Sequence, residues 1–238
     1  MYSKMKGGPM PVKILLVEDE EAIRKFTRIN LEQQGWKIYE AESGEEGLEI
    51  ARKVEPDLAI LDLMLPGISG YEVCETLRRE RPKIGIIMLT AKSQDVDRIL
   101  GLEKGTDDYM IKPFNPHELV LRIQSLIRRL DIQQEESLRI EQGPFVLDLE
   151  ARTLYKDGQE IDLTPTELSI IKLFFEESGK ALSRDSILSV IWGEDYNGET
   201  KIVDVNVRRI RAKVEENPAK PVYLETVWGV GYRWKKIK

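Results

Sequence analysis

The fold of this 238-residue chain is decided by the stretch Leu58-Ala59-Ile60-Leu61-Asp62-Leu63-Met64-Leu65-Pro66-Gly67. Four apolar residues run without a break into the carboxylate of Asp62, and Pro66-Gly67 then supplies a turn. A short, fully apolar run of this kind is typical of a strand buried on both faces of a parallel sheet. Asp62 would then lie at the carboxyl edge of the sheet, where open α/β sheets bind ligands.

Three more apolar runs in the first half of the chain also end in polar residues. These are Ile14–Val17 with Glu18 and Asp19, Ile84–Leu89 with Thr90, and Tyr109–Ile111 with Lys112. Because parallel strands end along one edge, we expect these side chains to converge with Asp62. Taken singly, each has an ordinary alternative, since acids often cap helices and a loop lysine is usually solvated. The ordered set at four strand ends favours one shared site.

Such a site suits a divalent metal and a phosphoryl group. Mg²⁺ prefers oxygen ligands and keeps several waters, so a few carboxylates are enough to hold it. A carboxylate can accept a phosphoryl group as a nucleophile. The metal and the Lys112 ammonium would offset the charge on the transferred group, and the Thr90 hydroxyl could bond one of its oxygens.

Strand and helix patterns alternate between residues 12 and 130. Apolar residues recur at helical spacing between the runs, as at Ile23, Phe26 and Ile29. This alternation indicates right-handed parallel crossovers and a sheet covered on both faces. We therefore expect residues 11–130 to form a flavodoxin-like α/β domain with a doubly wound, five-stranded parallel sheet.

The pattern changes after residue 130. Residues 131–137 lose the apolar period, which indicates a linker. Short strand-like segments follow, then helix starts such as the capping box Thr164-Pro165-Thr166-Glu167, and finally a hairpin around Trp228-Gly229-Val230. We expect residues 138–238 to form an α+β winged helix-turn-helix domain. Residues 1–10 are interpreted as an N-terminal extension, native or added, outside the fold.

Bulk composition narrows the class of protein. The chain is 41% hydrophobic and 33% charged, and no apolar stretch is long enough to span a membrane. The only cysteine, Cys74, excludes internal disulfides, and the only histidine, His117, excludes a histidine-based metal centre. We therefore expect a cytoplasmic protein, with His117 an ordinary surface residue. The net charge of −6 argues by itself against nucleic acid, but the distribution of charge matters more.

Positive charge is concentrated on one predicted helix over residues 200–215. Its apolar positions Val203, Val207, Ile210 and Val214 share one face at 100° per residue. The opposite and flanking positions hold Lys201, Val205, Arg208, Arg209, Arg211 and Ala212. An apolar back with a basic front suits a DNA major groove. The alternative is that this basic face is simply solvated and belongs to a protein-interaction module. The hairpin wing that follows the helix favours DNA binding over that alternative.

Four motifs of the first half resemble the receiver-domain signatures of two-component response regulators. They are Leu16-Val17-Glu18-Asp19-Glu20, Leu61-Asp62-Leu63-Met64-Leu65-Pro66-Gly67, Leu89-Thr90-Ala91 and Asp107-Asp108-Tyr109-Met110-Ile111-Lys112-Pro113-Phe114. The second half resembles the effector domain of the OmpR/PhoB subfamily. This resemblance implies a transcription regulator that takes its phosphoryl group from a sensor histidine kinase, which supplies the histidine.

The resemblance also implies a role for each pocket residue. Asp62 would be the phosphoacceptor, and Thr90 and Tyr109 the switch pair. Lys112 would contact the phosphoryl group, and its bond to Pro113 would be cis. The implied Mg²⁺ ligands are Glu18, Asp19, Asp62 and the main-chain carbonyl of Met64.

For DNA, the resemblance makes Val203–Arg211 the recognition helix and Thr226–Tyr232 the wing, bound to tandem promoter half-sites about one helical turn apart. The implied contacts are Lys201, Val205, Asn206, Arg208, Arg209, Arg211, Thr226, Trp228 and Tyr232. Many relatives have Arg where Trp228 stands, so the affinity of the wing is expected to differ. Trp192 and the loop to Glu199 match a region that can contact RNA polymerase, although core packing explains Trp192 equally well.

The resemblance also implies that a mixed-charge surface of the first half forms the interface of a homodimer after phosphorylation. The implied interface residues are Arg98, Ile99, Leu102, Asp107, Asp108, Glu118, Val120, Arg122 and Arg129. Considered from the residues alone, such a surface is usually just solvated, because isolated surface ion pairs contribute little. A two-fold receiver dimer would place two recognition helices on one operator.

Two other functions compete with that of a phosphorylation-gated transcription regulator. Metal-dependent phosphatases or phosphotransferases with an aspartyl nucleophile commonly need an acid/base carboxylate two residues later, and Met64 occupies that position here. A flavodoxin-like binder of small molecules would need a phosphate loop after the first strand, where Glu18-Asp19-Glu20 would repel an anion. We therefore expect a regulator and not an enzyme.

Overall fold

The computed structural model describes residues 11–91, 105–130, 139–194, 196 and 198–237. Its first half is a five-stranded parallel sheet in the order β2-β1-β3-β4-β5. The strands are β1 (Lys13–Val17), β2 (Lys37–Ala41), β3 (Leu58–Asp62), β4 (Gly85–Thr90) and β5 (Asp108–Ile111). The predicted doubly wound parallel sheet is confirmed. The helix predicted between β4 and β5 falls largely on residues 92–104, outside the described residues.

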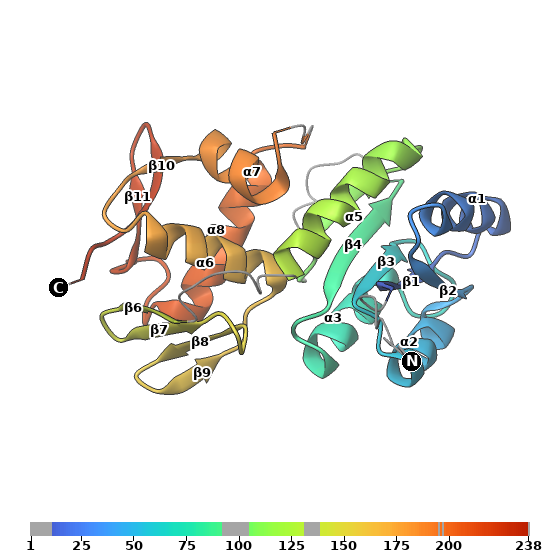
Figure 1. Cartoon of the computed structure of the whole chain (residues 1–238), viewed down its shortest axis with the longest axis horizontal. Coiled ribbons are helices and arrows are strands. Elements are labelled where there is room, and N and C mark those ends of the chain that lie inside the picture. The colour runs from blue at the N-terminus through green and yellow to red at the C-terminus, as the bar shows by residue number, and fades with distance from the viewer. Residues whose placement is uncertain (1–10, 92–104, 131–138, 195, 197, 238) are drawn as a thin grey trace, which may run out of the picture.

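Helices cover both faces of this sheet (Figure 1). They are α1 (Glu21–Glu32), α2 (Gly44–Val54), α3 (Gly70–Glu80) and α5 (Pro116–Leu130). Alternate strand residues enter two separate cores: Leu16 and Ile60 pack with α5 residues such as Ile123, whereas Leu15 and Leu61 lie in the cluster that contains the α3 residues. Burial on both faces explains why β3 is apolar from Leu58 to Leu61, up to the carboxylate that ends it.

Gly70 fixes how closely α3 approaches the end of β3. A Cβ atom at position 70 would lie 2.1 Å from the carbonyl oxygen of Asp62, so only glycine fits there without displacing the strand end. Ser69 caps the helix, and its hydroxyl accepts the N–H of Glu72. The loop after Asp62 is thereby held against the edge of the sheet.

The second half begins with a four-stranded antiparallel sheet and continues with three helices and a small hairpin sheet. Its elements are β6 (Arg139–Gln142), β7 (Phe145–Asp148), β8 (Thr153–Lys156), β9 (Gln159–Ile161), α6 (Pro165–Glu176), β10 (Leu182–Ser183), α7 (Arg184–Trp192), α8 (Lys201–Val214), β11 (Leu224–Val227) and β12 (Gly231–Trp234). This is the predicted winged helix-turn-helix arrangement, with the short β10 added to the wing sheet in the order β10-β12-β11. The linker predicted at residues 131–137 lies outside the described residues.

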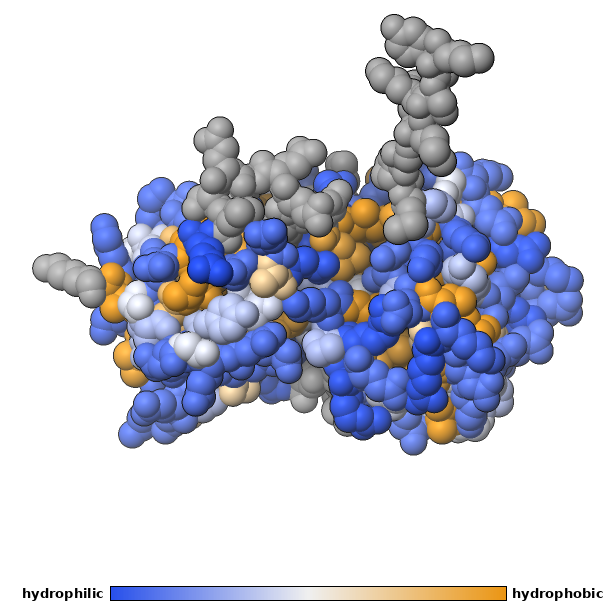
Figure 2. All heavy atoms as spheres, turned by 60° about the horizontal axis from the view of Figure 1, so that its bottom comes forward, coloured by the Kyte–Doolittle hydropathy of each residue, from blue (hydrophilic) through white to orange (hydrophobic). Residues whose placement is uncertain are grey.

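The two halves contact each other through α5, which packs on α6 and α7 (Figure 1). Lys83, before β4, also donates to the carbonyl of Ala151 at 2.6 Å. Figure 2 shows one face of the molecule as mainly hydrophilic, with apolar side chains in separate small areas. Among the helices within the described ranges, none is long and apolar enough to cross a bilayer.

Candidate phosphorylation pocket and nucleic-acid surface

The polar residues that follow β1, end β3 and follow β5 meet at the carboxyl edge of the parallel sheet. One carboxylate oxygen from each of Glu18, Asp19 and Asp62 lies within 4.8 Å of the other two. Lys112 donates to Asp62 Oδ2 at 2.6 Å and to Glu18 Oε1 at 2.8 Å. The peptide bond from Lys112 to Pro113 is cis. The sequence thus anticipated the residues that gather here, while their roles stay predictions.

Burial and the closeness of charged groups shift the pKa values of Glu18 and Lys112. Burial raises the pKa of Glu18 to about 7, and the Asp62 charge adds to the rise although Lys112 opposes it. Burial opposes the charge of Lys112, but its bonds to Asp62 and Glu18 outweigh this and raise its pKa. Glu18 Oε2 lies 2.7 Å from the ammonium, yet it is shielded from solvent and makes no well-directed hydrogen bond. A small divalent cation would relieve the repulsion between these carboxylates, so the residues fit Mg²⁺.

The other predicted pocket residues come from the loop after β3, from β4 and from β5. The main-chain N–H of Met64 donates to Asp62 Oδ1 at 3.0 Å, and the Met64 side chain is exposed. Thr90 is buried at the end of β4, and its carbonyl accepts the N–H of Lys112 at 2.7 Å. Tyr109 is buried in the apolar cluster that also contains residues of the second half. Thr90 therefore lies at the pocket edge, and Tyr109 lies in a core that the two halves share; their role as a switch pair stays a prediction.

The predicted dimer residues on β5 and α5 have partners within the same chain. Asp108 accepts from Arg122 Nη1 at 2.9 Å and from the hydroxyl of Tyr196 at 3.0 Å. Arg129 donates to Thr166 Oγ1 at 2.6 Å. An open surface at these positions is therefore a wrong expectation for this conformation, because the second half of the chain covers them.

The remaining dimer residues divide into four groups. Asp107 is wholly buried, and although burial opposes its charge, its ion pair with Arg78 lowers its pKa. Val120 was expected in an exposed apolar patch, but it is only 6% exposed and packs in the core, because that side of α5 faces the sheet. Glu118 pairs with Arg122 on the same helix at 2.6 Å. Arg98, Ile99 and Leu102 lie outside the described residues.

The exposed side of α8 joins the wing in one basic surface. Lys201 and Arg208 are exposed, as predicted. Arg211 donates to Thr226 Oγ1 at 2.9 Å, which holds the wing against the helix. A groove of about 740 Å³ lies between helix and wing, and its lining includes Asp204, Arg208, Arg211, Trp228, Tyr232 and Arg233.

Three predicted DNA contacts lie on a different side of α8. Asn206 is wholly buried and donates to the carbonyl of Ile202 at 2.8 Å. Val205 is 7% exposed, and Arg209 pairs with the buried Glu167 of α6 at 2.9 Å. These three contacts are unavailable in this conformation, because the helix turns that side toward neighbouring elements. Periodicity placed the residues on the helix but could not show what packs there.

Two tryptophans have opposite environments. Trp228 stands at the wing turn, where Gly229 takes a left-handed backbone with φ of 76°, and its side chain is 91% exposed. Trp192 is 3% exposed, with the Arg129 guanidinium carbon 5.3 Å from its ring centre. The packing interpretation of Trp192 is therefore the one that the contacts favour.

Sequence reasoning missed the residues of the second half that hold it to the first. Tyr196 lies in a polar loop and carries no local signal. Thr166 and Glu167 were recognised only as parts of a helix start, and the capping box is indeed present. A capping motif explains the bond from Thr164 N–H to Glu167, but not the ion pair of Glu167 with Arg209.

Comparison with known proteins identifies both halves. The model of the response regulator receiver domain matches residues 14–124, and the model of the C-terminal domain of transcriptional regulatory proteins matches residues 158–234. The transcriptional regulatory protein AfsQ1 of Streptomyces coelicolor is 44% identical over 220 residues, covering 92% of this chain and 96% of its own. The alkaline phosphatase synthesis transcriptional regulatory protein PhoP of Bacillus subtilis is 40% identical, covering 96% and 99%.

Solved structures agree with these matches over more than nine tenths of the chain. A mutant of RitR superposes with a TM-score of 0.77 at 27% identity, covering 94% of this chain and 99% of its own. DrrB, an OmpR/PhoB homologue of Thermotoga maritima, gives 0.52 at 33% identity, covering 95% and 100%. The chain therefore belongs to the OmpR/PhoB-type two-component response regulators, which join a receiver domain to a DNA-binding domain and regulate transcription.

Proposed function

We propose that Asp62 accepts a phosphoryl group from a sensor histidine kinase, with Mg²⁺ held by Glu18, Asp19, Asp62 and the main-chain carbonyl of Met64. The observation that carries the proposal is the meeting of three carboxylates and one ammonium at the end of β3. Bound Mg²⁺ would supply positive charge beside the transferred group. The kinase would supply the phosphorylated histidine, and His117, exposed on α5, is given no part in the transfer.

The chain's own residues would position and stabilise the transfer. An Asp62 carboxylate oxygen forms a P–O bond while the P–N bond of a phosphohistidine breaks, and the imidazole leaves with the electron pair and takes up a proton. The N–H of Met64 orients the carboxylate through Oδ1. The Lys112 ammonium and the Thr90 hydroxyl bind phosphoryl oxygens. The thioether of Met64 cannot transfer a proton, so hydrolytic turnover is not supported.

Phosphorylation with acetyl phosphate and Mg²⁺, followed by intact mass, tests this assignment. Wild type should gain one phosphoryl group and Asp62→Asn none. Asp57→Asn is the matched control, because Asp57 lies at the opposite end of the same strand and its carboxylate accepts the N–H of Lys13. Equal labelling of wild type and Asp62→Asn would contradict the assignment of Asp62 as the phosphoacceptor.

The second half is proposed to bind tandem promoter half-sites through α8 and the wing. Arg208, Arg211 and the wing present cations and an aromatic ring around one groove, and Lys201 is exposed at the start of the same helix. Such a surface fits a duplex whose phosphates attract the cations while the helix reads the major groove. Binding should weaken steeply with salt, since each phosphate contact releases counterions.

Replacing Arg208 with Ala tests the recognition face. Affinity should fall for an operator selected from random duplexes, by roughly 1–3 kcal/mol if the arginine contacts a base. Arg52→Ala is the control, since Arg52 pairs with Glu80 on the surface of the first half. If Arg208→Ala binds both the selected and the scrambled duplexes as wild type does, α8 is not the helix that recognises DNA.

Phosphorylation is further proposed to shift monomer toward a receiver homodimer, which would bring two α8 helices to adjacent half-sites. The pairing of Arg122 with Asp108 and Glu118 supplies a rigid charged cluster for such a contact. In this conformation, however, the cluster is already in contact with the second half.

A further inference from the structure

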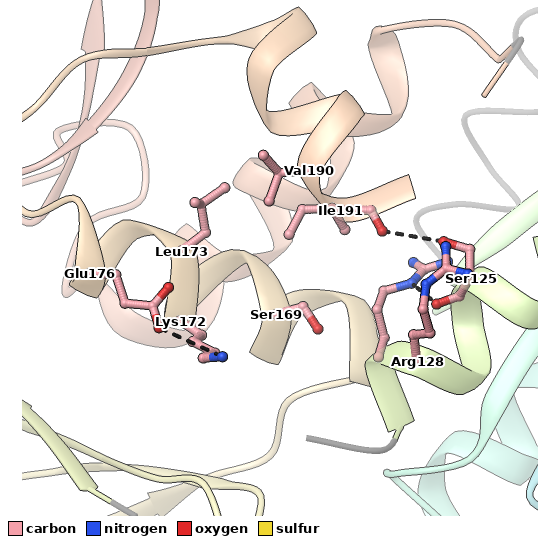
Figure 3. Close-up of a pocket in the computed structure, with 9 residues that line it drawn as sticks. Ser125, Arg128, Ser169, Lys172, Leu173, Glu176, Val190 and Ile191 are labelled. Atoms are coloured by element: carbon pink, nitrogen blue, oxygen red, sulfur yellow. Dashed lines mark hydrogen bonds and ion pairs between the residues drawn. The ribbon is translucent and has the colours of Figure 1, made fainter. Parts of the chain in front are cut away.

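A small cavity lies where α5 of the first half meets α6 and α7 of the second half. Its volume is about 220 Å³, whereas pockets for drug-sized ligands start at about 300 Å³, so it suits a small molecule. Figure 3 shows Arg128 and Ser125 of α5 at one end of its lining, and Lys172 and Glu176 of α6 at the other. Arg129 lines the cavity as well, and we name this space the arginine cavity.

Arg129 is a buried cation that forms no ion pair within the described ranges of the chain. Its side chain is 5% exposed; Nη1 donates to Thr166 Oγ1 at 2.6 Å, but Nη2 is buried and has no acceptor among the described residues. Asp107 and Asp108 are each paired with another arginine. Burial lowers the pKa of Arg129, and the charges of these two acids only partly oppose this. An anion beside the guanidinium would therefore stabilise it.

Trp192, at the end of α7, adds a second buried donor to the same boundary. Its ring centre lies 5.3 Å from the guanidinium carbon of Arg129. The indole N–H of Trp192 likewise finds no acceptor in the part of the chain that the structure describes. Buried donors are normally satisfied, so two such groups in one contact show that this boundary is short of acceptors. The oxygens of an anion would supply them.

Arg128 brings a second positive charge to the same end of the cavity. It is exposed, and its Nη2 lies 3.9 Å from the position that a Cβ atom would take at Gly193, where α7 ends. The carbonyl end of α7 attracts this cation but carries no full negative charge. At the other end of the cavity, Lys172 and Glu176 lie 3.6 Å apart and compensate each other. The arginine end is therefore left with two positive charges, which match a dianion.

We propose that the arginine cavity binds a dianionic phosphate group, either as inorganic phosphate or as the phosphate of a small phosphomonoester. Arg128 and Arg129 hold the phosphate, because the guanidinium fork matches the geometry of phosphate oxygens. Leu173 and Val190 provide an apolar wall for the organic part of an ester. The bound ligand would contact α5 on one side and α6 and α7 on the other, and so would strengthen the contact between the halves.

This site is independent of the proposed function. Its lining shares no residue with the carboxylates around Asp62 or with the groove beside Arg208. Binding of phosphate here can therefore be measured separately from phosphorylation and from DNA binding.

Calorimetric titration of the full-length chain with inorganic phosphate tests the proposal. The buffer contains EDTA, so that Mg²⁺ does not bring phosphate to Asp62. Wild type should bind one phosphate, and Arg128→Gln should raise the dissociation constant roughly tenfold, because a charge-assisted hydrogen bond is lost. Arg79→Gln is the matched control with an unchanged constant, since Arg79 is also an exposed arginine in the last turn of a helix, α3. Arg208→Ala is the control for phosphate bound at the α8 groove.

Thermal unfolding gives a second readout that does not depend on the heat of binding. Phosphate should raise the unfolding midpoint of wild type more than that of Arg128→Gln, and sodium chloride at equal ionic strength should raise neither in this way. Arg128 is the residue of choice because its side chain is exposed, so its replacement leaves the core intact.

Glycerol phosphate, titrated in the same way, distinguishes the two sources of the phosphate group. Tighter binding than that of inorganic phosphate assigns the cavity to esters, and equal or weaker binding assigns it to free phosphate. The absence of saturable binding of either probe to wild type overturns the proposal. Equal binding by wild type and Arg128→Gln overturns it as well, and so does a loss of binding in Arg208→Ala, which would place the phosphate on the recognition helix.

Discussion

At the scale of single residues, Glu18 is the buried member of the carboxylate group. Its pKa of about 7 in the folded chain exceeds the ordinary value of 4.5, because burial disfavours its charge. Between these values the folded chain binds more protons than the unfolded one, so this group lowers stability as pH rises. The loss is absent below about pH 4.5 and complete above about pH 7.

In metal-free buffer, Glu18→Gln should therefore gain stability relative to wild type as pH rises through this window, by up to roughly 3 kcal/mol. Denaturant unfolding near pH 5 and near pH 7.5 measures the difference. The exposed neighbour Glu20 gives the control variant Glu20→Gln. A free-energy gap between wild type and Glu18→Gln that is equal at both pH values would contradict the prediction.

Trp228 stands at the wing turn, where the resemblance to the family leads us to expect an arginine. Its side chain is 91% exposed, which favours an aromatic contact with the DNA backbone or groove wall. Trp228→Arg should add one phosphate contact and steepen the salt dependence of log K by about 0.9. Salt titrations of wild type, Trp228→Arg and Trp228→Ala on the selected duplex measure the three slopes; the alanine variant should bind more weakly with an unchanged slope. Identical affinities and slopes for all three would mean that the wing tip does not touch DNA.

At the scale of elements, α6 links the wing domain to the rest of the chain. Its capping box is complete: the Thr164 hydroxyl accepts the N–H of Glu167, and the Glu167 carboxylate accepts the N–H of Thr164. The same carboxylate pairs with Arg209 and Lys213 on α8. The start of one helix therefore also positions the recognition helix.

Thr164→Ala should lower the free energy of unfolding by roughly 1 kcal/mol, because a buried helix start loses its capping hydroxyl. Ser169→Ala on the same helix is the control, since that hydroxyl donates to the Pro165 carbonyl and caps nothing. Thermal or urea unfolding of both variants gives the comparison. A loss for Ser169→Ala as large as that for Thr164→Ala would show that capping is not the cause.

At the scale of the whole molecule, Arg122 lies where the first half contacts the second. Arg122 pairs with Asp108, with Glu118 and with the ring of Tyr196. Arg122→Glu should weaken the phosphorylated dimer at least tenfold, because it places like charges together at a desolvated site, while Asp62 still accepts phosphate. Sedimentation and intact mass on the same sample separate the two effects. A dimer indifferent to Arg122→Glu would mean that another face is used.

The sequence by itself determined the order of strands and helices, the capped start of α6 and the residues gathered around Asp62. These follow from local rules: apolar runs define buried strands, and parallel strands must end at one edge, so Glu18, Asp62 and Lys112 had to converge. The spacing of Val203 and Val207 likewise indicated one buried side of α8, although burial extends further round the helix to Val205 and Asn206.

Only the tertiary structure decided what covers α5, Asp108 and the flank of α8 that carries Asn206 and Arg209. Periodicity marks a side chain as polar or apolar, but an ion pair such as Asp108–Arg122 is compatible with water, a second copy or another domain. The choice depends on contacts between residues about 90 positions apart, as in the bond from Tyr196 to Asp108, and no local pattern encodes such a pairing. The tertiary structure therefore decides what contacts this surface, whereas local sequence patterns show only that the surface is charged.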